Sequence, residues 1–186
     1  MSQGSLYTGA DSGFPEQKSG AVRTIESEHS YVHEGCAFYC CHEVLSLANN
    51  GVHQIEFTVP ASIEMHLKDF TYFVTGVPLL FELYQTPSLT TGSSSLTARN
   101  RHRGRDDDSL VVLKSNPTNV VLTNAKKLIS TYIGGGTGVG ATKSGGTRDN
   151  SLEWLLEADV YLLRITNLSG AAQTVAIELN WYELLE

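Results

Sequence analysis

The sequence predicts an all-β protein, a jelly-roll-like β-sandwich that carries an extended N-terminal arm. Apolar and polar residues alternate with a period of two, the alternating segments are short, and Gly, Pro or Asn closes most of them. No helical segments alternate with these strands, which disfavours a βαβ fold, and no repeat of fixed period suggests a propeller. For 186 residues we expect one sandwich domain over residues 28–186, preceded by an arm over residues 1–27.

The arm is predicted from composition. Residues 1–27 are rich in Ser, Gly, Glu and Gln and contain only scattered apolar residues, so they have no core of their own. Such a segment is either disordered or laid on a partner. It lacks the basic and apolar regions of a signal peptide, and no apolar run approaches the ~18–20 residues of a membrane span. We therefore expect neither a signal peptide nor contact with a membrane.

At least eight strands are expected. The first alternating segment, "CAFYCCHEVLSLA", fits a strand nearly as well as a helix, because its aromatic and cysteine residues favour extended structure. The strands that follow are "HQIEFTVP", "FTYFVTG", "PLLFELYQ", "SLVVLKS", "TNVVLTN" and "KKLISTYIG". In the last two, "DVYLLRITN" and "TVAIELNWY", apolar residues again alternate. The turn residues Asn167, Ser169 and Gly170 between them predict a β-hairpin.

Charge and cysteine content exclude several classes of protein. Twenty acidic and thirteen basic residues give a net charge of −7, which favours solubility and disfavours a nucleic-acid binder. Cys36, Cys40 and Cys41 lie in one short run, and their odd number argues against a disulfide framework. We interpret them as small apolar core residues of a reduced protein of intracellular origin.

The glycine-rich segment 133–150 resembles a phosphate-binding loop but does not meet its requirements. Thr142 stands where the last glycine of a Walker-type loop is needed, and Gly145 and Gly146 would break a helix that followed. The segment is therefore predicted to be a flexible loop.

The histidines give no firm metal site. His29 and His33 would share a helix face, but Gly35 follows at once, and on a strand the two would stand ~13 Å apart. We expect surface or turn histidines and no metal or other cofactor. Without a nucleophile elbow or an H-x-H pair either, the sequence offers no anchor for an enzyme, and none is predicted.

One polar segment stands out, "TARNRHRGRDDDS" at residues 97–109. It has an arginine at every second position and then three aspartates. On a strand the four guanidinium groups would form a stripe on one face, suited to carboxylates or phosphates; in a loop the two signs would neutralise each other. A solvated loop, a protein contact and, least, a nucleic-acid contact remain open. The candidate protein-contact residues are Arg99, Asn100, Arg101, His102, Arg103 and Arg105.

Three segments together resemble a family of structural proteins of tailed bacteriophages. They are "VHEGCAFYC", "LYQTPSLTTGSSSLTARNRHR" and "EWLLEADVYLLRITNLSGAAQTVAIELNWYE", and they span roughly residues 31–183. The chain resembles capsid cement or decoration proteins, which stabilise the phage head. It departs from the family in its arginine run, which usually reads N-R-N-R, and in its cysteine-rich strand.

The resemblance implies a non-enzymatic jelly roll that is made in the host bacterial cytoplasm and located in the virion, on the capsid surface. The implied partners are the major capsid protein and a second copy of the chain, as a homodimer rather than a trimer. An alternative is a tail- or fibre-associated carbohydrate-binding module, with Trp154, Tyr132, Tyr161 and Tyr182 as an aromatic platform.

Overall fold

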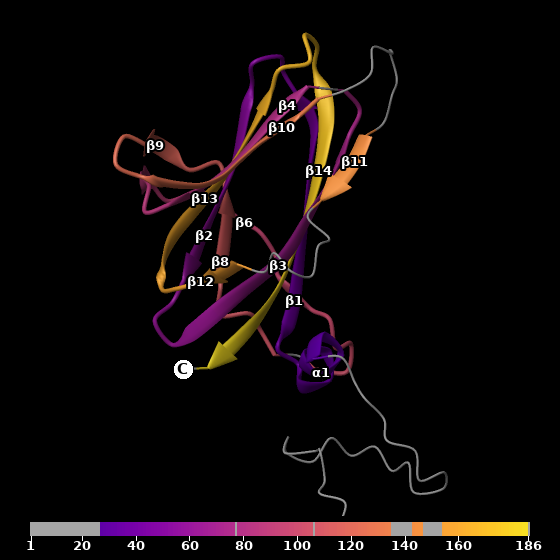
Figure 1. Cartoon of the computed structure of the whole chain (residues 1–186), viewed down its shortest axis with the longest axis vertical. Helices are drawn as coiled ribbons and strands as arrows, with labels where there is room; N and C mark the ends of the chain where they lie inside the picture. The colour runs from indigo at the N-terminus through magenta and orange to yellow at the C-terminus, as the bar shows by residue number, and fades with distance from the viewer. Residues whose placement is uncertain (1–26, 77, 106, 135–142, 147–153, 186) are drawn as a thin grey trace, which may run out of the picture.

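The fold is a sandwich of two antiparallel sheets, shown by a computed structural model in Figure 1. The structure describes residues 27–76, 78–105, 107–134, 143–146 and 154–185. The predicted arm thus lies outside the described residues, apart from its last residue. In the part that is described, no helix is long and apolar enough to cross a bilayer.

The first sheet has the order β11-β3-β14-β1-β7, and β12 also pairs with β3. Its strands are β1 (Ala37–Leu47), β3 (Ile63–Val74), β7 (Arg99–Asn100), β11 (Lys143–Gly146), β12 (Trp154–Leu156) and β14 (Gln173–Leu185). The second sheet has the order β10-β4-β13-β2-β8-β6. Its strands are β2 (Val52–Val59), β4 (Leu79–Gln85), β6 (Ser94–Ser95), β8 (Val112–Ser115), β10 (Lys126–Ile133) and β13 (Asp159–Asn167). A small separate ladder joins β5 (Ser88–Thr90) to β9 (Thr118–Val121).

The strand order is that of a jelly roll, as the sequence predicted. The four-stranded centres of the two sheets are β1-β14-β3-β11 and β2-β13-β4-β10. The chain alternates between the sheets from β1 to β4 and again from β10 through β11 and β13 to β14, which is the double Greek key of this fold. Residues 86–125 form a long excursion between β4 and β10, and this excursion contains the arginine-rich segment.

The expected hairpin of the last two strands is wrong. β13 pairs with β2 and β4 in the second sheet, whereas β14 pairs with β1 and β3 in the first. The turn residues between them therefore carry the chain from one sheet to the other. The same turn residues suit a hairpin and a crossover between sheets. The crossover is formed here because β13 and β14 each bury one face at the centre of a different sheet.

The core lies between the sheets and follows the predicted alternation. Val175, Ile177, Leu179 and Trp181 of β14 are all buried, and Trp181 stacks on Phe38 with ring centroids 6.1 Å apart. The ambiguous first segment is a strand, β1. Of the three free cysteines only Cys40 is a core residue; Cys36 is half-buried and Cys41 exposed, because neighbouring positions of a strand face opposite ways.

The glycine-rich segment contains an edge strand. The backbone of β11 pairs with β3 over Thr71–Val74, so the prediction of a flexible loop is wrong for residues 143–146. The parts of the segment at 135–142 and 147–150 lie outside the described residues.

Candidate protein-contact site

A short helix that the sequence analysis did not predict begins the described chain. α1 (Ser27–Glu34) ends at Gly35, whose φ is +80°. The Gly35 amide donates to the Val32 carbonyl at 3.2 Å and the Cys36 amide to the Tyr31 carbonyl at 2.9 Å. These two bonds are the Schellman arrangement, which satisfies the last carbonyl groups of a helix. The "HEGC" sequence is thus a helix stop signal.

The helix brings histidines together. His29 and His33 lie one turn apart on α1 with their Nε2 atoms 2.8 Å apart, and the rings of His33 and His102 meet edge to face at 6.5 Å. His29 and His33 are both exposed, as expected of surface histidines, but they lie on a helix and not in a turn, because α1 continues to Glu34 before Gly35 ends it. No group of three or more His, Cys, Asp or Glu residues is arranged for a metal ion within the described ranges.

The arginine-rich segment, residues 99–105, is not one strand. Only Arg99 and Asn100 pair with β1; the chain then turns, and the Arg105 amide donates to the His102 carbonyl at 3.1 Å. Of the two alternatives, the four-arginine stripe on one strand face is therefore wrong, since only Arg99 lies in a strand. The turn forms because the Asn100 Oδ1 accepts a bond from the His102 amide at 2.8 Å, which bends the backbone away from the sheet.

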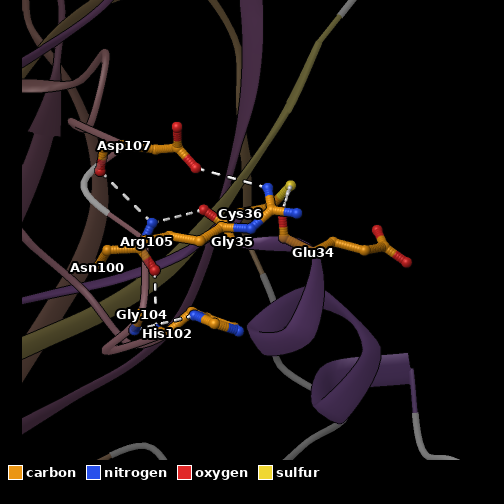
Figure 2. Close-up of polar contacts among 8 residues, drawn as sticks. All are labelled: Glu34, Gly35, Cys36, Asn100, His102, Gly104, Arg105 and Asp107. Carbon is orange, nitrogen blue, oxygen red and sulfur yellow. Dashed lines mark hydrogen bonds and ion pairs between the residues drawn. The ribbon is translucent and has the colours of Figure 1, made fainter. Parts of the chain in front are cut away.

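Asn100 fastens this segment to the end of α1. Its Nδ2 donates to the Gly35 carbonyl at 2.7 Å and to the Asp107 carbonyl at 3.4 Å, as Figure 2 shows. The Arg101 amide donates to the Ala37 carbonyl at 2.8 Å. Backbone and side-chain bonds thus hold the segment in one conformation.

Arg105 braces the end of α1, although its side chain is still 49 % exposed. A Cβ atom on Gly35 would lie 2.5 Å from the Arg105 Cδ, so the arginine stem packs directly over the glycine. The Arg105 Nη1 lies 3.5 Å from an Asp107 carboxylate oxygen (Figure 2). Here the aspartate that follows the arginines neutralises one of them, as the loop interpretation expected.

Glu183 anchors the end of the same excursion. This buried residue of β14 accepts bonds from the Ser109 hydroxyl at 2.5 Å, the Leu110 amide at 2.9 Å and the Trp181 indole at 2.9 Å. Its own amide donates to the Cys36 carbonyl. Glu183 therefore ties the start of β1 to the central strand through its backbone amide, and residues 109–110 through its carboxylate.

Arg101 and Arg103 remain exposed, above the outer face of the first sheet. The Arg103 guanidinium donates to the Tyr39 hydroxyl at 2.8 Å and lies 5.6 Å from the centre of that ring. An open hollow of about 230 Å³ lies beside them. We call it the arginine hollow; its lining residues are Tyr39, Arg101, Arg103, Glu178 and Asn180.

The floor of the arginine hollow is a polar patch of the sheet. Asn180 donates to the Asp69 carboxylate at 2.9 Å and to the Glu178 carboxylate at 3.0 Å. The Cys41 thiol lies 3.6 Å from the other Glu178 oxygen, and burial, together with the Glu178 charge, raises the pKa of that thiol. The sequence analysis missed these floor residues. Glu178 and Asn180 could have been found from the same alternation that predicts the core, because they occupy the outward-facing positions of the C-terminal strand.

The four aromatic residues of the carbohydrate alternative do not form a platform. Tyr161 is 1 % exposed and Tyr182 is 7 % exposed, since Tyr182 is stacked between Tyr31 and His66. Tyr132 is 61 % exposed on β10 of the second sheet, whereas Trp154 lies on β12 of the first. The two aromatic residues that remain accessible, Tyr132 and Trp154, thus lie on different sheets.

No family model, curated protein or solved structure matches this chain significantly. The resemblance to phage head proteins therefore depends on the sequence motifs alone.

Proposed function

We propose that this protein is a virion structural protein that binds the outside of a tailed-phage capsid and bridges neighbouring subunits of the major capsid protein. The observation that carries the proposal is the braced arginine-rich segment. Asn100 and the Arg101 amide bind the carbonyls of Gly35 and Ala37, and two bonds within the segment fix its turn. The Arg101 and Arg103 side chains stay exposed. A preorganised basic surface of this kind binds an acidic protein surface without a large loss of conformational entropy.

A second contact is available at the same end of the molecule. Residues 1–26 join the chain at α1, and α1 lies beside the arginine-rich segment through the bond between Asn100 and Gly35 (Figures 1 and 2). Two attachment points on one protein raise the effective concentration of the second once the first is bound. In our proposal the N-terminal segment reaches one capsid subunit and the arginine-rich segment its neighbour.

The proposed role is mechanical and needs no catalytic step. A protein that binds the assembled shell and not the separated subunits stabilises the shell by RT ln(1 + [L]/Kd) per site. An interface of the standard ~1,600 Å² is sufficient for specific binding. Many copies acting on one shell would then raise its resistance to heat.

The test uses phage heads that lack this protein. Purified protein is mixed with the heads, the heads are pelleted, and the bound copies are counted while the rupture temperature is followed. Saturable binding at a fixed ratio to the major capsid protein, with a higher rupture temperature, supports the proposal; absence of binding contradicts it.

A truncation separates the two attachment points. Removal of residues 1–26 should lower occupancy on the heads and leave the circular dichroism of the β-sandwich unchanged. Unchanged occupancy would show that the N-terminal segment takes no part in binding.

A further inference from the structure

We propose that the arginine hollow is a receptor for a single carboxylate side chain, Asp or Glu, of a partner protein. This inference deepens the proposed function and rests on it, because it names the group on the partner that the arginine-rich segment recognises. Three features support it: the free donors of two arginines, the charge and size of the hollow, and the binding of Glu178 to the floor and not to the arginines.

The two arginines have donors to spare. Of the five N–H groups of Arg103, one is used on the Tyr39 hydroxyl. Within the described residues, the Arg101 guanidinium makes no hydrogen bond or ion pair. A guanidinium presents its donors as a rigid fork that matches the two oxygens of a carboxylate. The backbone of Arg101 is fixed by its bond to Ala37, and the Arg103 guanidinium is positioned by its contacts with the Tyr39 ring and hydroxyl.

The carboxylate that already lines the hollow does not occupy these donors. Glu178 lies within ion-pairing distance of neither Arg101 nor Arg103 among the contacts of the described residues. Its oxygens accept instead from the Asn180 amide and face the Cys41 thiol on the sheet surface. Asn180 is itself 6 % exposed and is held by Asp69, so Glu178 is directed to the floor. The arginines above it therefore remain available to a group from outside.

Charge and size favour one carboxylate over other anions. Two arginines and one glutamate leave a single excess positive charge in the lining, which balances one carboxylate better than a doubly charged phosphate. The net charge of −7 on the whole chain disfavours a polyanion such as nucleic acid. The volume of about 230 Å³ is below the ~300–1,000 Å³ of small-molecule pockets and suits one amino-acid side chain.

The direct test is a titration of the full-length protein with the peptide acetyl-Gly-Glu-Gly-amide, followed by NMR at the arginine Nε–H groups. We expect shifts at Arg101 and Arg103 and binding in the millimolar range. Arg101→Gln and Arg103→Gln should each weaken binding about tenfold. The matched control is Lys126→Gln, the same change of charge at an exposed position on β10 of the second sheet, and it should leave the affinity unchanged.

Several outcomes would overturn the inference. One is an equal loss of affinity in Lys126→Gln, since binding would then follow net charge alone. Equal binding of acetyl-Gly-Gln-Gly-amide, or tighter binding of inorganic phosphate, would show that the hollow does not select a carboxylate. Binding of the neutral sugar maltotetraose in place of the peptide would assign the hollow to carbohydrate recognition.

The same variants on phage heads separate the two proposals. If all of them bind heads like the unaltered protein, the hollow is not the contact and the inference fails while the proposed function stands. If the unaltered protein binds the glutamate peptide but no heads, the proposed function fails and the hollow keeps its assignment. Weaker head binding by Arg101→Gln and Arg103→Gln, but not by Lys126→Gln, supports both.

Discussion

At the scale of single residues, Gly35 and Asn167 each meet a local requirement that other residue types do not meet. Gly35 has a left-handed φ and lies under Arg105, so it both ends α1 and admits the arginine-rich segment. Asn167 is 0 % exposed at the end of β13 and fills all its bonding capacity where the chain crosses between sheets. Both features concern the connections that place the strands, and neither adds to the apolar core.

Replacement of Gly35 by alanine should lower the free energy of unfolding by about 2–3 kcal/mol. About 1–2 kcal/mol comes from the left-handed backbone, and the rest from the clash with the Arg105 stem. Gly170 is the matched control, because its φ is +86° but a Cβ there meets nothing within 4 Å. Denaturant unfolding should show the smaller loss for Gly170→Ala. Adding Arg105→Ala should remove the excess loss of Gly35→Ala; equal losses at the two glycines would refute the clash.

Replacement of Asn167 by alanine should cost about 3 kcal/mol or more. Its Nδ2 donates to the carbonyls of Leu47 at 2.8 Å and Ala171 at 2.7 Å, and its Oδ1 accepts from Gln173 at 2.6 Å. Each buried partner left without a bond costs about 1–3 kcal/mol. Thermal or chemical unfolding measures the loss, with exposed Asn124→Ala as a control expected within ~0.5 kcal/mol. A loss under ~1 kcal/mol for Asn167→Ala would mean that water replaces the network.

At the scale of elements, the open side of the sandwich between β1 and β2 contains two stacked histidines. The rings of His42 and His53 lie 4.9 Å apart, and the buried Nε2 of His53 has no hydrogen-bond partner among the described residues. Burial, with a smaller effect of His42, lowers the pKa of His53 to about 4. Burial also lowers the pKa of His42. Both strands are therefore packed around neutral imidazoles.

The pair should make the fold sensitive to mild acid. The unfolded chain takes up protons at these histidines below pH ~6.5, whereas folded His53 does so only near its pKa of about 4. The contribution of neutral His53 to the free energy of unfolding should therefore be fully present above pH ~6.5. It should be lost as the pH is lowered toward 4, which reduces the free energy of unfolding by up to about 3 kcal/mol.

Unfolding by denaturant between pH 7 and pH 5, above the range of ordinary carboxylates, isolates this effect. His53→Leu should flatten the dependence on pH, and replacement of exposed His29 by Gln should leave it in place. An unchanged slope in His53→Leu would assign the acid sensitivity to other groups.

At the scale of the whole molecule, each terminal strand leaves one edge without a partner among the described strands. These strands are β11 and β7 in the first sheet, and β10 and β6 in the second. Exposed edges favour pairing with another chain unless they are covered. β10 begins with Lys126 and Lys127, the kind of charged side chain that discourages uncontrolled pairing. A closed, two-fold contact fits these features better than an open array.

We therefore predict a homodimer in solution. Light scattering coupled to size exclusion should give twice the mass of the chain at micromolar concentration. A monomer at that concentration would contradict stable self-association, and three times the chain mass would replace the dimer by a trimer. Because a dimer has two arginine hollows, it should bind phage heads more tightly than one copy of the chain does.

The sequence by itself determined the all-β class, the positions of most strands and the inward face of β14, because a period of two is a local property that each strand carries in its own residues. The jelly-roll-like sandwich that the sequence predicts also agrees with the observed strand order. The prediction of a polar, interaction-prone segment at residues 99–105 came from the same local reading.

Only the tertiary structure decided which strands pair. β13 and β14 are joined by five residues yet lie in different sheets, and β11 takes its place at an edge although its glycines predict a loop. The tertiary structure also placed Arg105 against the end of α1. It brought Arg101 and Arg103 to the same hollow as Glu178, which is 75 or more residues away in the chain. The physical reason is that partner choice depends on burial and hydrogen bonding between distant segments, which no local periodicity encodes.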